Sequence, residues 1–170
     1  SLDNIVIDSR VPKAYITAEL PAFSPNGDGV KDTQNLTVHT TLKDGLASWS
    51  AVVKPADSST AAPVKTWSSE KGDTLASSIQ WDGKADSGRV VPGTFIAELS
   101  LNYIKGDELV VSTAPFISST KAPELGVKLS PKYFSPDNDG NEDELFINLS
   151  AKSDTKVKQW SFEIREPEDT

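Results

Sequence analysis

Apolar and polar residues alternate along much of this chain with a period of two. Leu36 and Val38 are two residues apart, and Trp49, Ala51 and Val53 follow the same spacing. This period places alternate side chains on one face of a β-strand. No stretch shows the 3.6-residue apolar stripe with capping residues that is typical of an amphipathic helix. The pattern therefore predicts an all-β chain.

Seven strands are expected in the central part of the chain, separated by turns rich in Ser, Thr, Gly, Pro and Asp. The last two flank a short polar turn at residues 105–107, so we expect them to pair as a hairpin. Seven short strands within about 110 residues are typical of an immunoglobulin-like β-sandwich. The expected strands are residues 14–20, 35–42, 47–54, 63–68, 77–81, 93–104 and 108–118.

The core of such a sandwich is expected to consist of aromatic and aliphatic side chains alone. The chain has no cysteine, so the inter-sheet disulfide of antibody domains is excluded. Trp49, Phe95 and Phe116 are the candidate core aromatics. Burial of each would stabilise the fold by roughly 1.5–3 kcal/mol.

An internal repeat is visible at an offset of 111 residues. Phe134 follows Phe23 by this offset, and Trp160 follows Trp49 by the same offset. Apolar positions keep their phase along some 47 aligned positions, including "QWSFEI" (159–164), which matches the strand around Trp49. A repeat of this length indicates tandem modules.

The repeat predicts one whole module with incomplete copies on both sides. Residues 12–122 form the complete sandwich, residues 1–11 match the last strand of a preceding module, and residues 123–170 match the first half of a following one. We therefore expect the chain to be a piece of a longer tandem array. In an assembly of such modules, the strands expected at residues 3–9 and 14–20 could complete a neighbour's sheet by strand addition.

Two acidic loops, "FSPNGDGVKDT" (23–33) and "FSPDNDGNEDE" (134–144), occupy equivalent places in the repeat. Alternating Asn and Asp oxygens beside glycine suit calcium. An EF-hand is not expected, because the position of its bidentate glutamate falls on Asn35 and Phe146. A looser calcium site stays open, more so in the second loop, which has more carboxylates. Its candidate ligands are Asn26, Asp28, Asp32, Asp137, Asp139, Asn141 and Asp143.

A purely structural interpretation of these loops is also open and is favoured over a calcium site. Asn and Asp side chains can accept hydrogen bonds from the amides of their own loop, with Gly27 or Gly29 at positive φ. Phe23 would then close one end of the sandwich.

The segment "WDGKADSGRVVPGTFIAEL" (81–99) also has two interpretations. Trp81 with Asp82 and Asp86 could form a sugar-binding patch. The favoured alternative is a pair of tight turns beside a buried or half-buried indole.

Composition and motif content disfavour several functions. The net charge of −8 and the pI of about 4.6 disfavour nucleic-acid binding. No apolar run is long enough to insert in a membrane. His39 is the sole histidine, and its place in the alternation points its ring to the solvated face. With no nucleophile-elbow or phosphate-binding motif in the sequence, an enzyme is not expected.

The "WDG" segment (81–99) and the first acidic loop, "FSPNGDGVKDT" (23–33), resemble segments of bacterial immunoglobulin-like repeat modules. The "WDG" segment is similar to one in the immunoglobulin-like domain of the flagellar hook-scaffolding protein, and "FSPNGDG" is similar to a stretch of gliding-motility-type C-terminal domains. The resemblance implies an exported, non-enzymatic module of a periplasmic or cell-surface protein. The matching residues in the first segment are Trp81, Asp82, Gly83, Gly88, Pro92 and Phe95.

The expected function is accordingly structural. The partners expected are neighbouring modules of the same protein, with calcium as the one candidate cofactor, stiffening the array. The alternatives are a module that binds glycan or peptidoglycan through Trp67 or Trp81, and an assembly module that binds another protein by strand addition.

Overall fold

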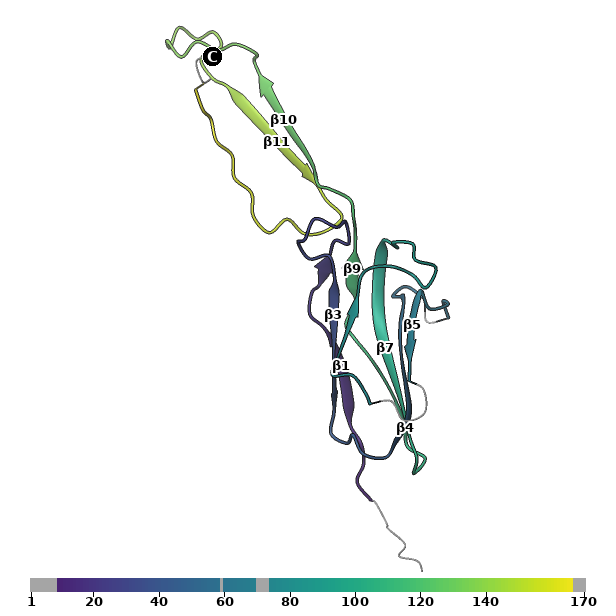
Figure 1. Cartoon of the computed structure of the whole chain (residues 1–170). Coiled ribbons are helices and arrows are strands. Elements are labelled where there is room, and N and C mark those ends of the chain that lie inside the picture. Colours follow the sequence, from purple (N-terminus) through teal and green to yellow (C-terminus); the bar gives the residue numbers. More distant parts are fainter. Residues whose placement is uncertain (1–8, 59, 70–73, 167–170) are drawn as a thin grey trace, which may run out of the picture. The chain divides into compact units, whose positions relative to one another are not determined.

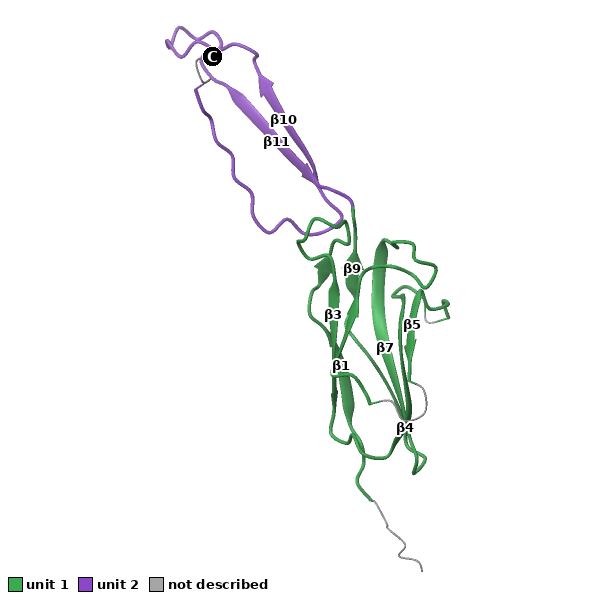
Figure 2. Cartoon of the chain, in the orientation of Figure 1, with its two compact units in different colours: residues 1–120 green, residues 121–170 purple. Residues whose placement is uncertain are grey.

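The computed structural model describes residues 9–58, 60–69 and 74–166. These residues contain eleven β-strands and no helix, so the prediction of an all-β chain is confirmed. The chain divides into two compact units, unit 1 (residues 1–120) and unit 2 (residues 121–170), coloured separately in Figure 2. The strand expected within residues 1–11 falls largely on residues 1–8, which lie outside the described residues.

Unit 1 is built from two β-sheets in a sandwich-like arrangement (Figure 1). The smaller sheet is antiparallel, with the strand order β1-β3-β6. The larger sheet has the order β2-β9-β7-β4-β5, and β8 also pairs with β7. The bounds are β1 (Ala14–Ala18), β2 (Ala22–Phe23), β3 (Gln34–Thr40), β4 (Leu46–Pro55), β5 (Lys65–Ser68), β6 (Ser78–Trp81), β7 (Gly93–Tyr103), β8 (Glu108–Ser112) and β9 (Phe116–Ser118).

The centre of the larger sheet is the antiparallel pair β4–β7, where the period-two pattern is strongest. Ala51 lies opposite Leu99 and Val53 opposite Ala97, and all four side chains are fully buried. The predicted hairpin is also confirmed, because β7 and β8 pair around Gly106, whose φ of 99° closes the turn.

The prediction of one continuous strand over residues 108–118 is wrong. The chain divides it into β8 and β9, which pair with different parts of β7. At the break, the Thr113 hydroxyl takes the place of a backbone acceptor and accepts a hydrogen bond from the amide of Ala97 at 3.0 Å. Pro115, which follows, has no amide hydrogen to donate to a ladder. After this break β9 also gains a parallel partner, β2, which the pattern did not predict.

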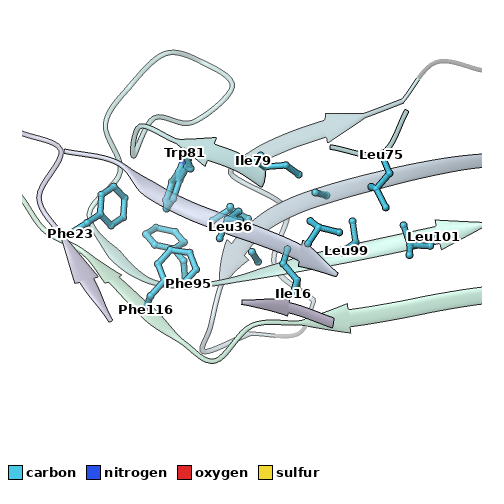
Figure 3. Packing of buried hydrophobic residues seen from close by; sticks show 14 of the residues in the cluster. Ile16, Phe23, Leu36, Leu75, Ile79, Trp81, Phe95, Leu99, Leu101 and Phe116 are labelled. Carbon is cyan, nitrogen blue, oxygen red and sulfur yellow. The ribbon is translucent and has the colours of Figure 1, made fainter. Parts of the chain in front are cut away.

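The core of unit 1 combines aliphatic residues of both sheets with an aromatic cluster at one end (Figure 3). Phe95 and Phe116 are 3% and 1% exposed, which confirms them as core residues. Trp49 is only partly buried and packs against the core from its margin. It lies where the pairing of β4 with β5 ends, since the amide of Ser69 bonds to the Trp49 carbonyl just beyond the last paired residues.

The described part of unit 2 contains a two-stranded antiparallel sheet, β10 (Glu124–Ser130) and β11 (Phe146–Lys152). Its register pairs Val127 with Leu149. Residues 153–166 contain no strand, so the strand-like pattern of "QWSFEI" (159–164) does not become a strand here. A strand needs a neighbour for its backbone hydrogen bonds, and this segment has none of the pairings that β4 makes with β5 and β7 in unit 1.

Candidate functional site

The first acidic loop, residues 24–33, is held by the carboxylate of Asp32. Its two oxygens accept hydrogen bonds from the amides of Gly27 and Gly29, both at 2.7 Å. Gly27 and Gly29 have φ values of 82° and 84°, and Lys31 has a φ of 55°. These left-handed conformations turn the two amides toward one carboxylate, which glycine allows without a steric penalty. Asp32 is therefore the clamp of the loop.

Two more side chains of the first loop accept hydrogen bonds from amides two residues later. Asn26 accepts from Asp28 at 3.1 Å, and Asp28 accepts from Val30 at 2.8 Å. The Asn26 amide group also donates to the Asp28 carboxylate at 2.9 Å. This bond and the one from Val30 hold the pKa of Asp28 below its usual value. The structural interpretation of the loop, with its side chains bonded to its own amides, is thus what the structure contains.

The second loop, residues 135–144, has the same geometry at the offset of 111 residues. The Asp143 carboxylate accepts from the amides of Asn138 at 2.7 Å and Gly140 at 2.9 Å. Asp137 accepts from the amide of Asp139 at 3.2 Å, and Asp139 accepts from that of Asn141 at 2.8 Å. Positive φ values recur at the equivalent positions, 63° at Asn138, 87° at Gly140 and 52° at Glu142.

The two loops differ in their charge. In the second loop the carboxylates of Asp137, Asp139 and Asp143 all come within 4.8 Å of one another. The first loop has Asn26 at the place of Asp137, so it has one carboxylate fewer, and the Asn26 amide group donates a hydrogen bond to Asp28. Three carboxylates at this spacing suit calcium, whereas in the first loop the Asn26 amide nitrogen, which cannot bind a cation, occupies one oxygen of Asp28. Of the candidate ligands, the structure brings these three carboxylates together; Asn141 enters the loop through its backbone amide.

The base of the first loop packs on the "WDG" segment, a contact that sequence reasoning missed. A Cβ atom added to Gly83 would lie 2.5 Å from Cγ of Pro25, and Gly83 has a φ of 74°. Phe23 packs with its ring centre 5.4 Å from that of Trp81. The two sequence motifs therefore form one structural element at the end of the sandwich. The pairing of a proline and a glycine far apart in sequence left no periodic signal that could have revealed it.

Trp81 is the centre of the aromatic cluster in Figure 3. It is 0% exposed, its Nε1 donates to the Lys84 carbonyl at 2.8 Å, and its ring contacts Phe95 and Phe116 at 5.2 and 6.0 Å between centroids. The sugar-patch interpretation of Trp81 is therefore wrong, because no face of the indole reaches solvent. The favoured alternative, a buried indole beside tight turns, is confirmed.

The acidic residues near Trp81 have partners that fix the turns. Burial raises the pKa of Asp82, but the hydrogen bonds and charge of Lys84 outweigh burial and hold this pKa below its usual value. Asp86 lies 3.1 Å from Lys65, whose Nζ sits 5.8 Å from the centre of the half-buried Trp67 ring. These groups stabilise the surface around the turns.

His39 lies on the exposed face of β3, as its place in the alternation predicts. Its ring stacks on that of Tyr15 with the centroids 4.3 Å apart and an angle of 15° between planes. This face is the solvent-exposed side of the small sheet of unit 1.

No protein-family model matches the chain, and neither does any curated protein sequence. Among the described residues, no helix could cross a membrane.

Proposed function

We propose that this chain is a non-enzymatic structural module of a bacterial exported protein, built from tandem immunoglobulin-like sandwiches. The observation that carries the proposal is the recurrence of one strand–loop–strand geometry at an offset of 111 residues. Ile16 pairs with Val38 in unit 1, and their counterparts Val127 and Leu149 pair in unit 2. The loop between the paired strands has the same hydrogen bonds in both units. Such recurrence is typical of modular arrays.

The strand order of unit 1 supports the immunoglobulin-like assignment. A three-stranded sheet β1-β3-β6 lies in a sandwich-like arrangement with a sheet that contains the succession β5-β4-β7-β8, and a similar division of strands between two sheets is typical of that fold. The exported location rests on the resemblance of the "FSPNGDG" and "WDG" motifs to bacterial surface modules.

A structural module must resist unfolding when its array is pulled. Single-molecule stretching of the whole chain tests this, and we expect unit 1 to unfold in one cooperative event. Roughly 110 residues at about 3.3–3.6 Å each give an extended chain of about 36–40 nm, and the gain in length is this value minus the end-to-end length of folded unit 1. Unfolding of unit 1 in several small steps, or without measurable resistance, would contradict a structural role.

Calcium binding by the second loop is the remaining part of the proposal, supported by the Asp137, Asp139 and Asp143 cluster. Thermal unfolding of the chain in excess EDTA and then in millimolar calcium tests it. We expect calcium to raise the midpoint of unit 2 by several degrees. Asp137→Asn, which gives the second loop the amide found in the first, should abolish the rise, whereas the control Asp28→Asn should leave it unchanged. An unchanged midpoint in the native chain would refute calcium binding.

A further inference from the structure

The first acidic loop contains the only Asn–Gly pair in the sequence, Asn26–Gly27. Asparagine is chemically labile, and most so before glycine, which has no Cβ to keep its backbone nitrogen away from the preceding side chain. Loss of the side-chain amide, which is called deamidation, needs only water at such a pair. Both residues are exposed, and a Cβ atom added to Gly27 would have no atom within 4 Å. Burial therefore does not protect the pair.

Deamidation has two steps, cyclisation and hydrolysis. The backbone nitrogen of Gly27 gives up its proton and attacks Cγ of Asn26. The new bond between this nitrogen and Cγ closes a succinimide ring, the bond from Cγ to Nδ2 breaks, and Nδ2 leaves as ammonia with that proton. Water then opens the ring. Opening at Cγ gives aspartate, and opening at the backbone carbonyl carbon gives isoaspartate, in which the main chain runs through the side chain.

The folded loop polarises the carbonyl group that would be attacked. Oδ1 of Asn26 accepts a hydrogen bond from the amide of Asp28 at 3.1 Å, and Nδ2 donates to the Asp28 carboxylate at 2.9 Å. Negative charge develops on Oδ1 during the attack, and the Asp28 amide would stabilise it as a donor of an oxyanion hole does. Any protection of Asn26 must therefore act on the attacking nitrogen.

That nitrogen is held back by Asp32. The Gly27 amide donates to Oδ1 of Asp32 at 2.7 Å, the length of a charge-assisted hydrogen bond. Removal of the amide proton would break this bond and would place a negative nitrogen beside a carboxylate, and both effects oppose the attack. The Gly29 amide bonds to Oδ2 of the same carboxylate at 2.7 Å and keeps it in place.

We propose that Asn26 is a deamidation site that the fold keeps unreacted, and that the Asp32 carboxylate is the group that protects it. The reaction would add a negative charge to the loop and, where aspartate forms, would give it the carboxylate that the second loop has at Asp137. This chemistry goes beyond the proposed structural role and is independent of it, because it requires only the folded loop.

The second loop provides an internal control. It has the same clamp, with the Asn138 amide bonded to Asp143 at 2.7 Å. The residue before Asn138 is Asp137, which has no side-chain amide to lose. The clamp of the second loop can therefore be removed without exposing an Asn–Gly pair.

The test follows deamidation of the whole chain at mildly alkaline pH by mass spectrometry of its peptides. We expect Asn26 to react at least about tenfold more slowly in the folded chain than in the chain unfolded by urea. A charge-assisted hydrogen bond of ordinary strength changes a rate by about one to two powers of ten. Asp32→Ala should accelerate the reaction in the folded chain by a similar factor, whereas the control Asp143→Ala should leave the rate at Asn26 unchanged.

A second variant separates charge from loss of the loop. Asp32→Asn keeps an oxygen acceptor without the negative charge and should give an intermediate rate. Circular dichroism shows whether unit 1 of each variant is folded, and if Asp32→Ala is not, Asp32→Asn against the native chain decides.

Equal rates in the folded and unfolded native chain would overturn the protection. An unchanged rate in the folded Asp32 variants would overturn the role of Asp32, and a slower rate would show that this carboxylate instead accepts the Gly27 proton as a base. Equal acceleration by Asp143→Ala would mean that general loosening of the chain is the cause. None of these outcomes would alter the stretching behaviour of unit 1, so the proposed structural role is tested separately.

Discussion

The two acidic loops have the same backbone and different surroundings. In both, one aspartate bonds two amides of its loop, and positive φ values fall at the same three places. The phenylalanine that precedes each loop behaves differently, since Phe23 is 3% exposed and Phe134 is 47% exposed. Phe23 packs on Trp81 from a distant part of the chain, whereas the described part of unit 2 has no counterpart of Trp81.

This contrast separates two contributions to the structure. One is the set of hydrogen bonds within the loop, and the other is the packing of the preceding phenylalanine against the rest of the sandwich. Ten residues with Asn, Asp and Gly at the right places are sufficient to form the loop, because each bond joins groups at most a few residues apart. Burial of the aromatic anchor requires a second segment that arrives from elsewhere in the fold. Separate substitutions can therefore remove the two contributions one at a time.

The largest effect is expected from Trp81→Ala. This change empties the centre of the aromatic cluster, where the indole is 0% exposed, and should lower the free energy of unfolding of unit 1 by about 3–5 kcal/mol. Denaturant unfolding followed by circular dichroism measures this. The matched change Trp160→Ala removes an indole that is 73% exposed and should shift stability by less than about 0.5 kcal/mol. Equal losses in the two variants would mean that Trp81 does not organise the core.

Gly83→Ala is expected to have the next largest effect on the stability of unit 1. The new methyl group would meet Pro25 at 2.5 Å and would sit on a backbone with φ of 74°, so we expect a loss of about 3 kcal/mol. Gly88→Ala is the control, because its φ is 81° but no atom lies within 4 Å of the added group. This control should lower the free energy of unfolding of unit 1 by only about 1–2 kcal/mol. If the two variants were equally stable, the contact between Pro25 and Gly83 would have no energetic weight.

Asp32→Ala removes the clamp of the first loop. Two amides at 2.7 Å lose their acceptor, and since the loop is solvent-exposed we expect a loss of about 1–2 kcal/mol in unit 1. Amide hydrogen exchange at Gly27 and Gly29 should accelerate, and this exchange is the direct readout. Asp143→Ala should accelerate exchange at Asn138 and Gly140 in the same way. Protection that persists in either variant would show that the clamp is dispensable.

The smallest effect concerns charge, and Asn26→Asp would make the first loop resemble the second. The Asn26 amide group is the main reason that the pKa of Asp28 lies below 3.8. Because this pKa is lowered in the folded state, the ionised Asp28 stabilises the loop above about pH 4, and that contribution is lost as the pH falls through the folded-state value. Asn26→Asp should raise the pKa of Asp28, as followed by carboxyl carbon resonances against pH. An unchanged titration would contradict the role of Asn26.

Local pattern predicted the strand content and the loop chemistry of this protein well. The period-two spacing around Leu36, Ala51 and Leu99 identified β3, β4 and β7 to within a few residues, because alternation records directly which face of a strand is buried. The bonding of Asx side chains to their own amides could be anticipated for the same reason, since all its partners lie within five residues.

Tertiary structure decided what depends on residues far apart in the chain. The break between β8 and β9 follows from how Thr113 meets Ala97, and the burial of Trp81 follows from Phe23, Phe95 and Phe116 closing around it. Dependence on distant residues also explains why "QWSFEI" (159–164) forms no strand among the described residues, although its alternation equals that of β4. By itself the sequence determined which segments are able to form strands. Whether each one does so is decided by the neighbour that supplies its backbone hydrogen bonds and covers its apolar side chains.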